Sequence, residues 1–199
     1  MTSNSHYICE FNLNDHEKIV IKSADSLEDI HFCDDIEIYF ISDNQDYRLF
    51  FDCFQYTLRS FIADFNDAIN NKLSLHSSIK QDLGYLWNEY LSGESKITFI
   101  KDNNSWVGKR HILWSSPGGL DQRLTTWLYN NENGEIILEI TPSYKWHFQD
   151  PEPGENYITY QQFIKNYQPL LFRTIDREVA KKWIIEAQEI LSRVEARDL

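Results

Sequence analysis

The segment Ile36–Ile69, IEIYFISDNQDYRLFFDCFQYTLRSFIADFNDAI, changes from a β-strand pattern to an α-helix pattern. Residues 36–42 and 47–51 are rich in β-branched and aromatic side chains, and a polar connection joins them, so we predict an antiparallel strand pair. After this pair, apolar residues recur at the three- and four-residue spacing of one helix face. These residues are Leu58, Phe61, Ile62, Phe65 and Ile69. The segment therefore predicts two strands followed by a helix that packs against them.

The rest of the chain also alternates between strand patterns and helix patterns. We predict further strands at residues 7–13, 18–22, 95–101, 106–114, 123–130 and 135–141. We predict further helices at residues 78–92, at residues 159–167 and from about Asp176 onward, the first with a capping box formed by Ser78 and Gln81. This order of elements predicts a single α+β domain over residues 1–199, with a largely antiparallel sheet and helices packed on it.

Charge is spread unevenly along the 199 residues, whose formal net charge is −12. Residues 1–100 contain 17 Asp and Glu but 7 Lys and Arg, whereas residues 101–199 contain 14 and 12. Binding to nucleic acid requires clustered cations, and anionic membrane surfaces attract cations for the same reason. The composition therefore argues against both ligands and favours a basic protein partner.

The cysteine count and the amino-terminal sequence bear on the cellular compartment. Cys9, Cys33 and Cys53 are an odd number without metal-type spacing, a pattern typical of reduced thiols. The first residues have neither a basic opening nor a long apolar run, and no stretch of the chain reaches the length of a membrane span. We expect a cytoplasmic protein.

The acidic segment is the most unusual feature of the sequence. Residues 23–47 contain eight carboxylates and no Lys or Arg: Asp25, Glu28, Asp29, Asp34, Asp35, Glu37, Asp43 and Asp46. In one interpretation they coat a solvated edge or pair with the basic stripe Arg173, Arg177 and Lys181. In the other they face a basic partner, with Tyr39, Phe40 or Tyr47 supplying the desolvated contacts.

A second candidate contact segment lies at residues 144–155. Tyr144, Trp146 and Phe148 alternate with polar residues, as in a strand with one aromatic face. That face can belong to the core. Alternatively, Trp146 and Phe148 are exposed anchors beside the acids Asp150, Glu152 and Glu155.

The sequence lacks the common catalytic motifs, including G-x-S-x-G, dinucleotide fingerprints and C-x-x-C. The best enzyme candidate is a phosphate- or nucleotide-handling site that uses Lys109, Arg110, His111 and Arg123. The same residues also fit a strand, a Pro-Gly-Gly turn and another strand. His31, Cys33 and Asp34 are too few to predict a metal site. We therefore predict no enzyme activity, cofactor or metal.

The acidic first half, the missing catalytic motifs and a tryptophan-rich block together resemble a known class of protein. The block is Trp106–Phe148, WVGKRHILWSSPGGLDQRLTTWLYNNENGEIILEITPSYKWHF. The chain resembles the small acidic immunity proteins that bacteria encode beside contact-dependent or Rhs-type polymorphic toxins. The resemblance covers most of the chain and transfers no individual functional residue. It implies a stoichiometric inhibitor that binds and neutralises a cognate basic toxin domain. A scaffold or regulatory module without a toxin partner is the remaining alternative.

Overall fold

The computed structural model describes residues 5–43, 45–76, 79, 82–92, 101–102, 105–116, 122–147 and 149–198. It confirms the predicted α+β fold class, but with two four-stranded antiparallel sheets in place of one. Within these residues, no helix is both long enough and apolar enough to cross a lipid bilayer.

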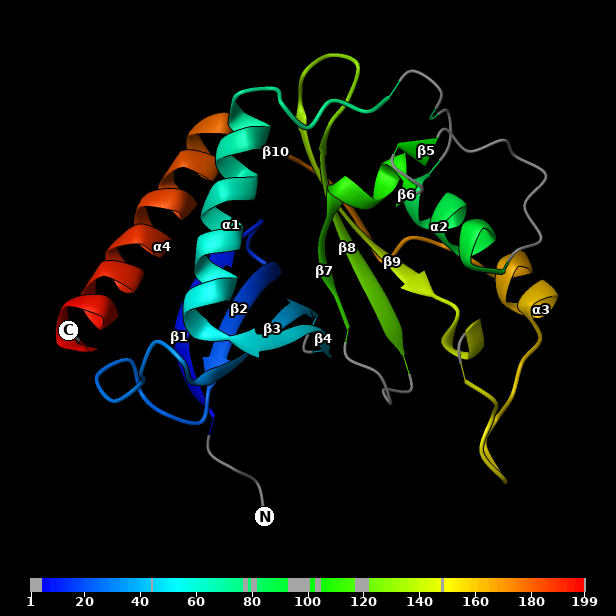
Figure 1. Ribbon diagram of the computed structural model, residues 1–199, viewed down its shortest axis with the longest axis horizontal. Coiled ribbons are helices and arrows are strands. Elements are labelled where there is room, and N and C mark those ends of the chain that lie inside the picture. The colour runs from blue at the N-terminus through cyan, green and yellow to red at the C-terminus, as the bar shows by residue number, and fades with distance from the viewer. Residues whose placement is uncertain are drawn as a thin grey trace.

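Sheet 1 is formed by the amino-terminal strands in chain order (Figure 1). The strands are β1 (His6–Asn12), β2 (Glu17–Ser23), β3 (Asp35–Ser42) and β4 (Gln45–Cys53), and α1 (Phe54–Ile69) follows directly. Apolar residues alternate along β3, so Ile36, Ile38 and Phe40 are almost completely buried. The predicted helix stripe is also internal, because Leu58, Phe61 and Phe65 are fully buried.

Sheet 2 repeats this succession of four sequential strands and a helix. Its strands are β7 (Ile112–Ser115), β8 (Arg123–Asn130), β9 (Ile136–Ser143) and β10 (Leu171–Ile175), and α4 (Arg177–Asp198) follows. Helices α1 and α4 pack against each other, while α2 (Leu83–Ser92) packs on β8 and β9 (Figure 1). The remaining elements are β5 (Lys101–Asp102), β6 (Ser105–Trp106), the 3-10 turns η1 (Val107–His111) and η2 (Lys145–His147), and α3 (Tyr160–Lys165).

One hydrophobic core joins the two sheets. The Phe61 ring of α1 stacks on Phe11 of β1 at 4.7 Å between ring centroids and on Trp114 of β7 at 6.0 Å. Trp183 of α4 contacts Phe11 at 5.5 Å and Phe65 at 5.6 Å. Helix α1 therefore buries its apolar face against both sheets, and α4 packs on α1 and sheet 1. Such burial contributes about 25 cal/mol per Å² of apolar surface removed from water.

Several predicted elements differ in the structure. Strand β10 was not expected, because only its end residues Leu171 and Ile175 are buried and the period-2 signal is weak. Residues 107–111 form a 3-10 turn and not a strand, which exposes Lys109 and Arg110 together while burying His111.

Helix α2 begins at Leu83, and the Asp82 side chain accepts a hydrogen bond from the Tyr85 backbone at 2.9 Å. The predicted capping box of Ser78 and Gln81 lies outside the described residues, as does most of the predicted strand at 95–101.

Candidate protein-interaction face

The strand alternation in sheet 1 directs a second set of side chains away from the core. Cross-strand partners in an antiparallel sheet share a face, so the strand registers define this set. We call it the outer face of sheet 1, consisting of Tyr7, Glu10, Asn12, Lys18, Val20, Lys22, Asp35, Glu37, Tyr39, Ile41, Asp46, Arg48 and Phe51.

Two aromatic side chains on this face are open to solvent, with Tyr7 57% and Phe51 43% exposed. Basic side chains lie over the rings. The Lys22 ammonium is 4.4 Å from the Tyr39 ring centroid and 5.2 Å from that of Tyr7, and the Arg48 guanidinium is 5.2 Å from Phe51. These cation–π contacts hold the exposed rings in place on the face.

Three of the four acids on this face, Glu10, Glu37 and Asp46, are matched by cations of the same sheet, and Asp35 is not. Three ion pairs cross it: Lys18 with Glu10 at 2.6 Å, Lys22 with Asp46 at 2.8 Å and Arg48 with Glu37 at 2.8 Å. The Tyr39 hydroxyl also donates to Glu37 at 2.8 Å. Desolvation, followed by this hydrogen bond, raises the pKa of Tyr39 to about 12. The outer face is therefore a mixed-charge surface with aromatic residues and not a purely acidic one.

The structure brings only part of the acidic segment to this face. Asp35, Glu37 and Asp46 lie on it together with Tyr39, as the register shows. Two of the matching cations, Lys22 and Arg48, are the residues that immediately flank the Lys- and Arg-free segment 23–47. The segment thus contains no cation of its own, but strand pairing places its neighbours beside its acids.

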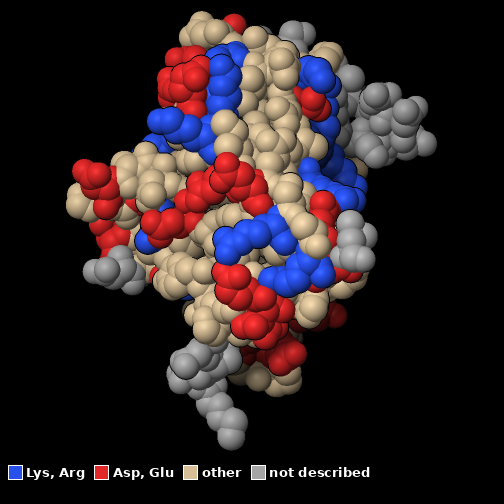
Figure 2. All heavy atoms as spheres, turned by 90° about the vertical axis from the view of Figure 1, so that its left-hand side faces the viewer, with Lys and Arg blue, Asp and Glu red and all other residues tan. Residues whose placement is uncertain are grey.

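Four other predicted acids belong to a loop that is fastened to the end of α4: Asp25, Glu28, Asp29 and Asp34. Glu28 pairs with Arg193 at 2.5 Å, and Arg197 donates to the carbonyls of Leu27, Glu28 and Ile30. Asp29 accepts from Ser26 and Asp34 from the His31 backbone. Lys and Arg accordingly lie beside Asp and Glu on the side of the molecule that carries α4 (Figure 2). These contacts attach the loop to the carboxyl-terminal end of α4.

The basic stripe predicted to neutralise the acidic segment does not do so. Arg173 makes a two-point contact with Glu17, Arg177 donates to the carbonyls of Ile69 and Gly134, and Lys181 pairs with Glu178. Within the described part of the chain, the carboxylates of Asp25, Asp35 and Asp43 have no hydrogen-bond or ion-pair partner. Five of the eight acids in the segment therefore have an internal partner, and in three of them, Glu28, Glu37 and Asp46, that partner is a cation.

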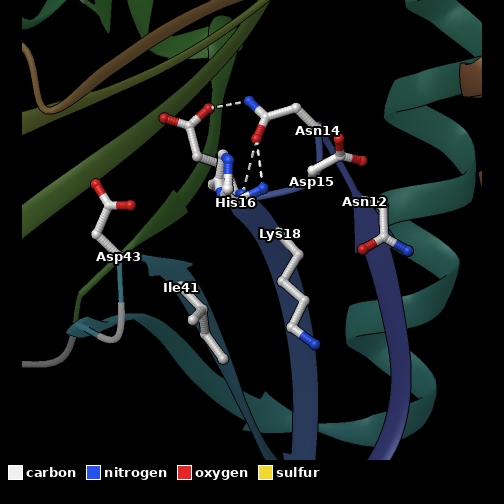
Figure 3. A pocket seen from close by; sticks show the side chains of 8 residues that line it. Asn12, Asn14, Asp15, His16, Lys18, Ile41 and Asp43 are labelled. Carbon is white, nitrogen blue, oxygen red and sulfur yellow. Dashed lines mark hydrogen bonds between the residues drawn. The ribbon is translucent and has the colours of Figure 1, made fainter.

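Asp43 lines a polar hollow of about 320 Å³ at one end of sheet 1 (Figure 3). The β1–β2 turn and the β3–β4 hairpin form it, with Asn12, Asn14, Asp15, His16, Glu17, Lys18, Ile41 and Asp43 as its lining. Asn14 holds the turn, because its side chain accepts from the His16 and Glu17 backbones and donates to Glu17 at 2.6 Å. The sequence predicted Asp43 but none of the turn residues, which only the hairpin pairing brings close to it.

The predicted aromatic strand at residues 144–148 is wrong where it can be assessed. Strand β9 ends at Ser143 and residues 145–147 form η2, while Phe148 lies outside the described residues. Trp146 is half-buried, and its indole donates to Glu155 at 3.2 Å. Asp150 and Glu152 are exposed in the following loop. This segment packs as a small aromatic cluster with Tyr144 and Tyr157, so Trp146 is not a freely exposed anchor.

The residues of the enzyme alternative do not meet in one pocket. His111 is 1% exposed and contacts Tyr129, and burial, then Arg110, lower its pKa to about 4. Arg123 lies six residues from Tyr129 along β8, a separation of about 20 Å in an extended strand. His111 therefore has no access to a substrate held by Arg123.

Possible metal ligands are also engaged elsewhere. His31 contacts the Asp198 carboxylate at 2.9 Å, and Asp34 accepts from the His31 backbone. Over the residues that the structure covers, no group of three His, Cys, Asp or Glu side chains is arranged to hold a metal ion.

Sequence reasoning missed a buried glutamate, Glu139, between α2 and sheet 2, beside the half-buried Asp82. Glu139 of β9 is 2% exposed, accepts from the Tyr129 hydroxyl at 3.1 Å and shares a hydrogen bond with Asp82. Tyr167 donates to Asp82 at 2.7 Å. Burial, followed by the nearby Asp82, raises the pKa of Glu139 to about 8. The sequence signal that could have revealed it is a single acid, Glu139, between the apolar residues Leu138 and Ile140.

Comparisons with protein-family models, with curated proteins and with solved structures found no match to this chain.

Proposed function

We propose that this protein is a stoichiometric inhibitor, an immunity protein that binds and neutralises a toxin domain, and that the outer face of sheet 1 is its contact surface. One observation carries the proposal. Tyr7 and Phe51 are exposed on an open sheet face and are surrounded by charged side chains that already pair with one another. Aromatic residues at the centre of an interface supply much of its binding energy, whereas a polar rim excludes water and sets the orientation.

The electrostatic part of the proposal follows from the charges that remain unmatched. The net charge of −12 and the unpaired carboxylates of Asp25, Asp35 and Asp43 attract a cationic partner and accelerate its association. The paired acids on the outer face contribute mainly to specificity, because a partner must align with three existing ion pairs. The partner is therefore a protein with positive net charge and an apolar patch at the centre of its contact surface.

The test uses the toxin domain encoded beside this gene and two matched phenylalanine variants. Phe51→Ala removes an aromatic side chain from the outer face, while Phe172→Ala removes one that is 53% exposed on the edge strand β10. We expect calorimetry to show that Phe51→Ala weakens binding at least about tenfold, since truncating an aromatic anchor of an interface costs about 2 kcal/mol. Phe172→Ala should leave the affinity within about twofold.

Two results would contradict the proposal. In the first, Phe51→Ala and Phe172→Ala lower the affinity for the toxin domain equally, or neither of them lowers it. The other is an affinity that does not fall when the salt concentration is raised from about 50 to 300 mM, because exposed charges are screened over that range. A neighbouring gene that encodes a metabolic enzyme would favour the scaffold alternative instead.

A further inference from the structure

A small cavity lies at one end of sheet 2, away from the outer face of sheet 1. The carboxyl-terminal part of α2 meets the ends of β7, β8 and β9 and the turn η2 there, around a volume of about 150 Å³. Its lining combines apolar walls with polar groups, among them Trp87, Leu91, Ser115, Arg123, Ser143 and His147. A mixed lining with convergent polar groups is typical of ligand sites and not of packing defects, which are apolar.

Arg123 is the only one of these groups that carries a full positive charge at neutral pH. Its Nη2 donates to the side-chain oxygen of Gln149 at 2.6 Å, but its Nε is buried without an acceptor. Among the described residues, no carboxylate lies within ion-pair distance of Arg123. Arg48 offers the contrast, because its Nε is equally orphaned but its guanidinium is neutralised by Glu37 at 2.8 Å. A buried donor on an unpaired cation favours an anionic ligand.

The neighbouring groups suit a carboxylate and do not compete with it. Burial, and then the charge of Arg123, lower the pKa of His147 to about 4, so the imidazole is neutral near pH 7. The hydroxyls of Thr125 and Ser143 lie 2.8 Å apart and share one hydrogen bond, which leaves one of their two hydrogens for another acceptor. Trp87 and Leu91 supply an apolar wall beside these polar groups.

We propose that this cavity binds a carboxylate on a small apolar body, with Arg123 as the residue that recognises the anion. A cavity of about 150 Å³ accommodates a group the size of a benzene ring. The ligand is either a free small acid or the carboxyl terminus of a peptide chain, since both present the same group. This site uses no residue of the outer face of sheet 1 and does not depend on the proposed inhibitor function.

The experiment titrates the intact protein with benzoate and follows the Trp87 and His147 resonances by NMR. Benzylamine has nearly the same shape but the opposite charge and serves as the control ligand. We expect benzoate to shift both resonances with a dissociation constant of about 1 mM, a reasonable value for so few atoms, and benzylamine to have no effect. A parallel titration with N-acetyl-alanyl-alanine tests the peptide terminus, and the tighter of the two binders identifies the source of the carboxylate.

Variants separate recognition of the anion from general folding. Arg123→Gln should weaken benzoate binding about tenfold or more, the loss expected when a charge-assisted hydrogen bond is removed. Arg48→Gln removes the other arginine with an orphaned Nε and should leave binding unchanged. Leu91→Trp fills the cavity and should abolish binding while Arg123 is still present. Unaltered binding in Arg123→Gln, equal binding of benzylamine, or no shift with either carboxylate would overturn the proposal.

Discussion

The two sheets carry the same tyrosine–glutamate hydrogen bond in opposite environments. On the outer face of sheet 1, Tyr39 donates to Glu37 at 2.8 Å, and Glu37 is partly exposed and paired with Arg48. In sheet 2, Tyr129 donates to Glu139 at 3.1 Å, but α2 covers the pair, and among the described residues no Lys or Arg forms an ion pair with Glu139. The pKa of Glu139 consequently rises to about 8, mainly through burial. A covering helix thus converts a charged surface group into a protonated packing group.

The difference explains how two units with the same order of elements come to hold their polar groups in different protonation states. An open sheet face can keep its charges, because water and neighbouring cations stabilise them, and it remains available to a partner. A covered face must pair or protonate every polar group that it buries. We therefore expect changes under α2 to affect folding, and changes on the outer face of sheet 1 to affect binding.

The largest effect should follow from Gly84→Ala, at the closest approach of α2 to sheet 2. A Cβ atom there would lie 2.2 Å from the Thr141 hydroxyl and 2.5 Å from that of Tyr167. Although Gly→Ala normally stabilises a helix by about 1 kcal/mol, we expect a loss of about 3 kcal/mol in the free energy of unfolding. Urea denaturation measures it. Gly154→Ala meets no atom within 4 Å and should cost about 1 kcal/mol, from its positive φ. A stabilised Gly84→Ala protein would refute the close packing.

A smaller effect should follow from Lys22→Met on the outer face of sheet 1. Lys22 is only 8% exposed and contacts the rings of Tyr7 and Tyr39 as well as the Asp46 carboxylate. We expect a loss of about 1.5 kcal/mol, because several partly desolvated contacts of one cation disappear. Lys18→Met is the matched control. Its ion pair with Glu10 is more exposed to solvent, so Lys18→Met should lower the free energy of unfolding much less than Lys22→Met, and equal losses in both variants would argue against the difference in burial.

The smallest effect is the pH dependence that arises from Glu139. The pKa of Glu139 is higher in the folded than in the unfolded chain. Between these two pKa values the folded state binds more protons, so the free energy of unfolding falls as the pH rises towards about 8. His111 and His147 have lowered pKa values and act in the opposite direction, but mainly below pH 7. We expect a net loss of about 1 kcal/mol between pH 7 and pH 8.5. Glu139→Gln should remove most of this slope in thermal unfolding, and a slope unchanged by that substitution would exclude Glu139 as its source.

Local sequence patterns predicted most of the regular structure. The alternation in residues 36–51 and the helical spacing from Leu58 to Ile69 correspond to β3, β4 and α1. The helix predicted from about Asp176 onward corresponds to α4, which buries Trp183, Ala187 and Val194. Strand β10 was not predicted because its three middle residues are exposed and give no alternation of apolar and polar side chains. The aromatic alternation at residues 144–148 predicted a strand that the described residues do not form. Tyr144 packs against Tyr160 and Phe163 of α3, and Trp146 packs against Tyr144.

The candidate site was less predictable than the fold, for a physical reason. The sequence identified Glu37, Tyr39 and Asp46, but Tyr7 and Lys22 reach them only through the pairing of β1, β2 and β3. The cavity beside Arg123 is assembled from even more distant segments, including α2 and η2. A contact between residues that are far apart in the chain leaves no periodic signal, so local reasoning cannot detect it.

By itself, the sequence determined the α+β class, the positions of most strands and helices, and the acidic net charge. These depend on side-chain periodicity and composition, which act within a few neighbouring residues. Only the tertiary structure decided which carboxylates stay charged, because that depends on whether a cation or a helix lies over each of them. Glu37 meets Arg48 at the surface, whereas Glu139 lies beneath α2 and retains its proton at neutral pH.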